Sequence, residues 1–454
     1  MLVVRKTQDF MQTYMEYSDA SESPDSFHRW TAIGTVAGVL RRRCWINQGR
    51  FQWTPNFYLI FVAPPGIVQK STTIGFGLDL LKQVKGIHFG PDSLTWQAMV
   101  EEMAGIQENM NIGGIVGAFY PMSCVTLGIS ELGTLLDTEN KQMIDIMVDL
   151  WDSPQKEWRK KTKTQGEDRI VNPWINMMAC TTPKWVGDNM TGQTISGGFL
   201  SRCLFVYGEE KRKLIHLPSQ FVAAHHDELK DALVSDLRHI AQHIKGEYHY
   251  HRDAIQWDRE WYDRHNAQDF SHLAFTMVSG YIQRKQTHIH KTAMVLAATR
   301  RDEMVIMKED LITAERMVTD LEEDMEKVFG QMEIRTSSNM RYSDDVVTRV
   351  RYHKKINKQA LYRDMFARKK MSKNDFDTIV KSAIAAGEIE QVGTDLIWVT
   401  LQSGTTPQSG GTPFVGPVQP GDPAPESESG VYVREGTAST SYLKSLVYGP
   451  VPRR

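Results

Sequence analysis

A lysine and two hydroxyl side chains follow an apolar run early in the chain. The run covers residues 57–62, and PPGIVQKST follows it at 64–72. In a loop between a strand and a helix, backbone N–H groups face a phosphate, a lysine reaches the outer phosphates and a hydroxyl holds Mg²⁺. The sequence therefore predicts a nucleotide-binding loop whose residues are Pro65, Gly66, Gln69, Lys70, Ser71 and Thr72.

This loop departs from the usual pattern G-x-x-x-x-G-K-[ST] at two positions. Pro64 replaces the first glycine and Gln69 the second, although Gly66 can still supply one permissive turn. The alternative interpretation is an ordinary capped helix start that binds no ligand.

A second apolar run, CVTLGI at 124–129, ends at Ser130 and Glu131. A carboxylate at the end of such a strand faces the phosphate loop, holds Mg²⁺ through water and orients the attacking water. We therefore expect Glu131 to be catalytic, and Ser71 and Glu131 to hold the metal. Ser130 stands where an aspartate is usual, and the alternative interpretation of the pair is a helix N-cap with an acidic first turn.

Two further apolar runs have polar residues at one end. WINMMA at 174–179 precedes Thr181 and Thr182, either of which could hydrogen-bond the attacking water or the γ-phosphate. CLFVY at 203–207 follows Arg202, on a loop that contains two glycines. This arginine is equally compatible with a local salt bridge.

The elements that position these residues alternate along the chain. The four apolar runs are typical of strands buried on both faces, and helices are expected between them at 72–84, 93–107 and 141–151. Short buried strands that alternate with helices predict an α/β fold with a mainly parallel sheet. Ligands in such sheets bind beyond the carboxyl ends of the strands.

The rest of the chain divides by composition. Apolar residues at spacings of three and four predict a helix within 23–43, and amphipathic helices follow residue 215 at 227–243, 254–267, 280–298 and 308–329. Three short helices and two strands after residue 340 predict a winged helix-turn-helix. The tail that follows is rich in Gly, Pro, Ser and Thr and has few large apolar residues to bury, so it cannot offset the entropy of ordering and is predicted to be disordered. The predicted regions are a helical N-terminal region (1–50), a P-loop core (51–214), a helical lid region (215–335), a winged helix (340–401) and a disordered tail (402–454).

The overall composition excludes some classes of protein. The chain has 53 Lys and Arg against 55 Asp and Glu, a formal net charge of -2, which excludes a uniformly basic nucleic-acid coat and leaves local basic surfaces open. Four widely spaced cysteines favour buried free thiols over a zinc site. Because no apolar stretch of about 18 residues occurs, we expect no membrane span and a cytoplasmic protein.

The order of these motifs resembles a known family. The succession APPGIVQKST, VTLGISEL, NPWINMMACTTP and GGFLSRCLFVY, with SFHRW at 26–30, is similar to the helicases associated with primases in phages and mobile elements. These belong to the superfamily-III and minichromosome-maintenance-like branch of the AAA+ ATPases. The resemblance covers roughly residues 20–330.

The resemblance implies both a chemistry and an assembly. It implies ATP and Mg²⁺ as cofactors, with Lys70 and Ser71 at the phosphates, Glu131 as the carboxylate and Thr182 as a sensor. It also implies that Arg202 is an arginine finger given to the neighbouring subunit, which requires a ring, expected to be a hexamer. Arg284, in the lid region, is a further candidate for contact with the γ-phosphate.

Two basic segments are candidate DNA contacts. The segment WRKKTKTQG at 158–166 predicts a hairpin, at the place where the resembling helicases insert one into the ring channel. Trp158 could stack on a base, and the alternative is that it only packs against the protein. The winged helix could dock a protein in place of DNA. A third basic segment, Arg41–Arg43, is interpreted as a solvated helix end. The predicted DNA contacts are Lys160, Lys161 and Lys163 in the hairpin and Lys354, Lys355, Lys369 and Lys370 in the winged helix.

The sequence therefore predicts an ATP-dependent, ring-forming helicase or translocase that acts on single-stranded or forked DNA, with any primase a separate protein. The alternative from another class is a non-enzymatic or weakly hydrolysing DNA-loading factor with a degenerate nucleotide site, which Gln69 and Ser130 support. A packaging motor would need a nuclease, and the chain has no clustered-carboxylate nuclease signature.

Overall fold

The computed structural model describes most of the chain up to residue 398. The described residues are 4–91, 93, 95–106, 108–111, 119–136, 141–152, 157–162, 166–190, 198–268, 270, 278–329, 345–369, 371–385 and 387–398. The predicted tail, 402–454, lies outside them.

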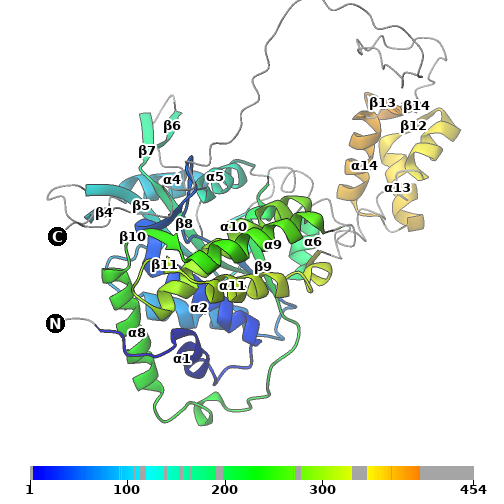
Figure 1. Ribbon diagram of the computed structural model, residues 1–454. Coiled ribbons are helices and arrows are strands. Elements are labelled where there is room, and N and C mark those ends of the chain that lie inside the picture. The colour runs from blue at the N-terminus through cyan, green and yellow to red at the C-terminus, as the bar shows by residue number, and fades with distance from the viewer. Residues whose placement is uncertain are drawn as a thin grey trace, which may run out of the picture. The chain divides into compact units, whose positions relative to one another are not determined.

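A five-stranded sheet lies at the centre of the structure up to residue 329 (Figure 1). Its order is β4–β5–β8–β3–β9, formed by β4 (Glu108–Asn111), β5 (Phe119–Ile129), β8 (Pro173–Thr181), β3 (Tyr58–Val62) and β9 (Cys203–Tyr207). All of these strands are parallel except β4. β3, β8 and β9 are buried along their whole length, which explains their continuous apolar sequences. The predicted α/β fold with its four parallel strands is confirmed.

Helices pack against this sheet and against one another. They include α2 (Asp25–Leu40), α3 (Lys70–Leu81), α4 (Trp96–Gly105) and α5 (Lys141–Trp151). α2 and α3 approach closely, because a Cβ added at Gly77 would lie 2.2 Å from Oγ1 of Thr35. Thr73 in α3 also donates, at 2.6 Å, to the hydroxyl of Ser23, which lies just before α2. These contacts fix the helix that begins at Lys70.

A second sheet, which the sequence did not predict, joins distant parts of the chain. Its order is β11–β10–β1–β2, from β11 (Val305–Ile306), β10 (Gly246–Tyr250), β1 (Cys44–Asn47) and β2 (Gln52–Trp53). β1 and β10 pair in parallel, so the predicted N-terminal and lid regions share one sheet. They also share one apolar core, which extends from Phe10 to Phe329.

The helices of the lid region largely follow the prediction. They are α8 (His226–His243), α9 (Arg252–Ala267), α10 (Val278–Arg300) and α11 (Lys308–Asp320), and α11 is shorter than predicted. α11 packs against both α10 and α9. No helix among the described residues is long and apolar enough to cross a membrane.

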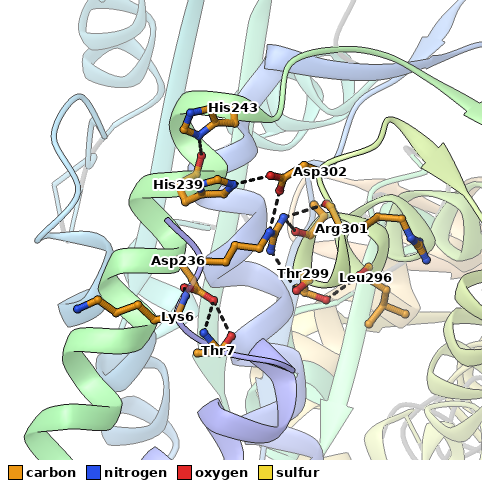
Figure 2. A network of polar contacts seen from close by, with 11 residues as sticks. Lys6, Thr7, Asp236, His239, His243, Leu296, Thr299, Arg301 and Asp302 are labelled. Atoms are coloured by element: carbon orange, nitrogen blue, oxygen red, sulfur yellow. Dashed lines mark hydrogen bonds and ion pairs between the residues drawn. The ribbon is translucent and has the colours of Figure 1, made fainter. Parts of the chain in front are cut away.

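The segment before α1 (Phe10–Tyr17) is fastened to this region by polar contacts (Figure 2). The backbone N–H groups of Lys6 and Thr7 donate to the buried carboxylate of Asp236, at 2.5 and 3.2 Å. Arg5 donates to three backbone carbonyls at the end of α10 and, at 2.7 Å, to Asp302. The last carbonyls of a helix have no partner within it, so Arg5 caps α10.

Residues 345–398 form a module with its own apolar core. Residues 345–353 are helical, and β12 (Lys355–Asn357), α13 (Lys358–Lys369), α14 (Lys373–Ala385), β13 (Ile389–Val392) and β14 (Asp395–Trp398) follow. The strands form an antiparallel sheet of order β12–β14–β13. The three predicted helices and both predicted strands are present, and β12 is an addition.

The four cysteines are buried free thiols, as predicted. Burial raises the pKa of Cys124 and of Cys180 to about 12, and it also raises the pKa of Cys44 and Cys203. These thiols are therefore protonated near neutral pH and act as small apolar groups.

Candidate nucleotide site and basic surfaces

The loop between β3 and α3 is shaped by Gly66 and closed by Lys70. Gly66 has a φ of 76°, which glycine adopts more readily than other residues. Lys70 Nζ donates to the backbone carbonyls of Ala63, at 2.9 Å, and Pro64, at 3.4 Å. α3 begins without a side-chain cap, unlike the ordinary capped helix start of the alternative interpretation. The N–H of Lys70 donates to the carbonyl of Val68 at 2.9 Å, so the N–H groups of Ser71 and Thr72 are the ones that could meet an anion.

The strand register brings three of the predicted features to one edge of the sheet. Val62 pairs with Thr181, and Ile129 pairs with Ala179, so the carboxyl ends of β3, β8 and β5 lie together. β8 lies between the other two strands. Neighbouring strands lie about 4.8 Å apart, so β5, the strand that Glu131 follows, is roughly 10 Å from β3.

The last residue of β8, a threonine, contacts the candidate catalytic carboxylate. Thr181 Oγ1 donates to Glu131 Oε1 at 3.4 Å. Thr182 instead caps α6 (Pro183–Asn189), and its hydroxyl accepts from the N–H of Trp185 at 3.2 Å. Glu131 makes no side-chain cap to the short helix that follows it. The resemblance implied Thr182 as the sensor, but Thr181 is the threonine in contact with Glu131, because the hydroxyl of Thr182 caps α6.

The electrostatics and donor types of this edge suit a magnesium nucleotide. Burial lowers the pKa of Lys70, while Cys180 and Glu131 act in the opposite direction. Ser71 and Thr72 are exposed at the start of α3. The described residues contain no group of three or more His, Cys, Asp or Glu side chains that could hold a metal. Mg²⁺ commonly uses one or two carboxylates together with phosphate oxygens, so Ser71 and Glu131 fit it as partial ligands.

Arg202 lies at the opposite edge of the sheet from this loop. Tyr58 pairs with Cys203, so Arg202 is next to the beginning of β3, whereas the loop follows its end. Five residues of strand separate the two edges by roughly 16 Å. Arg202 is 7% exposed, and its Nη2 donates to Asp152 Oδ2 at 2.6 Å. The local salt bridge that the sequence left open is therefore present.

Several cations gather around this salt bridge. Burial, followed by the charge of Arg202, lowers the pKa of Arg284, for which no ion pair is found among the described residues. Lys291 is fully buried with its Nζ 3.5 Å from the ring centroid of Trp151. A cleft of about 490 Å³ is lined by Arg284, Lys291, Trp151 and Asp152, among others. The sequence analysis found Arg202 and Arg284 and missed Lys291 and Asp152, because no motif marks them.

The predicted hairpin is present as β6 (Trp158–Thr162) and β7 (Gly166–Ile170), and it extends away from the five-stranded sheet (Figure 1). Lys160 Nζ lies 3.2 Å from the ring centroid of Trp96, and burial lowers its pKa. Trp158 packs against the main core, as the alternative interpretation held. Lys160 thus already has an aromatic partner within the chain.

Two arginines that the sequence analysis did not select are the exposed cations of this hairpin. Arg159 and Arg169 are about half exposed, and each pairs with a glutamate. The distances are 2.7 Å from Arg159 to Glu157 and 3.1 Å from Arg169 to Glu167. Lys163 and the side chain of Lys161 lie outside the described residues.

The basic residues of the module at 345–398 are partly neutralised. Lys354 and Lys355 are exposed, and Lys355 Nζ lies 3.2 Å from Asp395. Arg349 and Arg368 both pair with Asp364. Lys370 and the side chain of Lys369 lie outside the described residues.

The interpretation of Arg41–Arg43 as a solvated helix end is wrong. Arg41 is 8% exposed and Arg42 is 1% exposed, and Arg42 Nη1 donates to the carbonyl of Pro173 at 3.0 Å. The chain turns at the end of α2 into β1, so these side chains point into the protein, where backbone carbonyls need donors.

No protein-family model matches this chain, and no curated protein is significantly similar to it in sequence.

Proposed function

We propose that this chain is an ATP-dependent DNA helicase or translocase of the AAA+ class that works as a ring. Residues 51–214 form its P-loop core, and residues 345–398 form a winged helix. The observation that carries the proposal is the meeting of the Lys70 loop, Glu131 and Thr181 at one edge of a parallel sheet. This is the edge at which ligands of such sheets bind.

Each residue at this edge has a role in the proposal. Lys70 exchanges its two carbonyl partners for phosphate oxygens, which bind a cation more strongly because they are charged. Ser71 and Glu131 hold Mg²⁺. Glu131 also orients the attacking water, and Thr181 fixes the carboxylate through its hydroxyl. ATP supplies the phosphoryl group that is transferred to water.

The proposed ring rests on the role given to Arg202. About 16 Å of strand separates Arg202 from the loop of its own chain, so a contact with nucleotide would have to be made at the loop of a neighbouring subunit. Arg284 lies near Arg202: after burial, the charge of Arg202 is the next cause that lowers the pKa of Arg284. Arg284 therefore adds to the positive field around Arg202. We propose that both face the nucleotide of the adjacent subunit.

The hairpin supplies the proposed contact with DNA. Arg159 and Arg169 present exposed guanidinium groups on a projecting element, and the proposal adds Lys161 and Lys163 as further contacts. Such groups bind phosphates without reading sequence. The winged helix adds Lys354 and Lys355.

ATP hydrolysis by the purified full-length protein, with and without single-stranded DNA, tests this proposal. We expect Lys70→Ala to abolish DNA-stimulated hydrolysis, because the loop then has no side-chain cation for the phosphates. Lys184→Ala is the matched control, since Lys184 is exposed in α6 and pairs only with Asp188 among the described residues. Hydrolysis that is unaffected by Lys70→Ala would disprove the proposal.

The alternative is a DNA-loading factor that hydrolyses ATP weakly or not at all. The closed salt bridge of Arg202 with Asp152 favours it, as do Gln69 and Ser130 at positions where catalytic loops have other residues. Arg202→Ala separates the two functions. A helicase loses its DNA-stimulated rate in this variant, whereas a loading factor keeps the same low rate and still binds DNA.

A further inference from the structure

A basic pocket lies at the far end of α3 from the Lys70 loop. Its volume is about 320 Å³, at the lower end of the range for small-molecule sites. It is lined by residues of three separate segments, among them Arg41, Arg43, Gln83, Lys85, Arg238 and Gln242. We propose that this pocket binds a phosphate-bearing anion of about mononucleotide size.

The lining carries a surplus of positive charge. Arg41, Arg43, Lys85 and Arg238 line the pocket, and no lining residue is acidic. The carboxylate that contacts this group is Glu108, which pairs with Arg41 and lies 3.5 Å from His88 Nε2. One carboxylate against four cations leaves a field that attracts an anion.

Backbone carbonyls orient three of these cations, one of which, Arg41, also pairs with Glu108. Arg41 donates to the carbonyl of Gly86 at 2.7 Å, Arg43 donates to the carbonyl of Ala241, and Arg238 donates to the carbonyl of Gln83 at 3.0 Å. Backbone carbonyls orient a guanidinium group without cancelling its charge. Ala241 lies in the last turn of α8, so the contact of Arg43 also caps this helix, whereas Gln83 and Gly86 lie in the turns that follow α3.

The backbone and the buried donors show that this arrangement is under constraint. Arg41 has a φ of 51°, which residues other than glycine rarely adopt. The Nε atoms of Arg41 and Arg43 are buried, with no hydrogen-bond partner. Burial, and next the charge of Arg41, lowers the pKa of Arg43. A bound anion would relieve the repulsion between the two guanidinium groups.

The pocket is distinct from the proposed nucleotide site. α3 begins at Lys70, and the pocket is lined by Gln83 and Lys85 just beyond its other end, roughly 20 Å along the helix axis. Guanidinium groups match the geometry of phosphate oxygens, which favours phosphate over other anions. The phosphate could belong to a free phosphorylated molecule or to a nucleic acid.

Calorimetric titration of inorganic pyrophosphate into full-length protein tests the proposal. The Lys70→Ala background weakens binding at the loop. In this background we expect one site per chain, and the double variant Lys85→Gln with Arg238→Gln should weaken it at least about tenfold. The control is Lys82→Gln with Lys245→Gln, which removes two exposed cations from the same segments but none from the lining. The control should bind as its parent does.

A second titration identifies the source of the phosphate. If a single-stranded oligothymidylate displaces pyrophosphate from the background protein, the pocket takes nucleic-acid phosphates; if it does not, the ligand is a small phosphorylated molecule. Both results support a phosphate site. No binding of pyrophosphate to the Lys70→Ala protein, or equal binding by the two double variants, would overturn the proposal. The outcome does not depend on ATP hydrolysis.

Discussion

The two edges of the central sheet hold their charged groups in different ways. At the carboxyl edge, Lys70 donates to backbone carbonyls and Glu131 accepts from a threonine hydroxyl. At the amino edge, Arg202 has a carboxylate 2.6 Å away. The carboxyl edge therefore keeps its charges unneutralised at short range, as a site for a charged ligand requires, whereas the amino edge neutralises its main cation within the chain.

This difference bears on how the two edges would meet in a ring. A loop whose cation contacts only neutral groups can bind phosphate by exchanging weak partners for a strong one. Arg202 must instead leave Asp152 before it can reach a neighbour's nucleotide. Asp152 is about half exposed, so water partly screens its attraction for Arg202. In this conformation, Arg202 at the amino edge is thus bound to its own chain and is not available to a neighbour.

The largest expected effect is at the carboxyl edge. Glu131→Gln keeps the hydrogen bond from Thr181 but removes the charge that we propose orients the attacking water, so ATP turnover should fall by roughly 10²- to 10⁴-fold while nucleotide still binds. Steady-state hydrolysis and equilibrium nucleotide binding measure the two quantities. Glu101→Gln, in an exposed position of α4, is the control. An equal loss of rate in both variants would contradict the role of Glu131.

A smaller effect is expected from the buried histidine at the amino edge. Burial lowers the pKa of His288 to about 3, and Nε2 of His288 is 3.0 Å from the carbonyl of Ser201. The unfolded chain binds a proton at His288 below about pH 6.5 while the folded chain does not, so acid destabilises the fold. From pH 7.5 to 5.5, His288 should lower the free energy of unfolding by about 1.4 kcal/mol.

Chemical denaturation at the two pH values checks this expectation. His288→Gln retains a donor for the Ser201 carbonyl. Between pH 7.5 and pH 5.5, its free energy of unfolding should fall by about 1.4 kcal/mol less than that of the parent protein. His249→Gln is the control, because the side chain of His249 is 71% exposed. If His288→Gln and the parent show the same pH dependence, His288 is protonated in the folded protein.

The smallest expected effect is at the salt bridge itself. Asp152→Asn leaves an acceptor for Arg202 but removes its counter-charge, so the free energy of unfolding should fall by about 1 kcal/mol or less. The control is Asp188→Asn in the exposed pair with Lys184, which should change stability by less than about 0.5 kcal/mol. Thermal or chemical unfolding at pH 7.5 measures both. A larger loss for Asp188→Asn would reverse the comparison.

The sequence by itself determined the central sheet and the order of its motifs. Residues 57–62, 124–129, 174–179 and 203–207 are continuous apolar runs, and such runs form strands when both faces are covered, so local composition was sufficient to locate them. The parallel arrangement then places Lys70 and Glu131 at the same edge. The hairpin at 158–170 and the helices of the module at 345–398 were found for the same reason, because each has a local pattern.

Only the tertiary structure decided which side chains are paired and which short segments form a sheet. β1, β2 and β11 are two to four residues long, too short for a periodic pattern, and the pairing of β1 with β10 joins positions about 200 residues apart in the chain. The choice of Thr181 over Thr182, the pairing of Arg202 with Asp152 and the burial of Arg41 and Arg42 also depend on distant neighbours. Long-range contacts leave no signal in a single sequence, because the partners are set by folding and not by spacing.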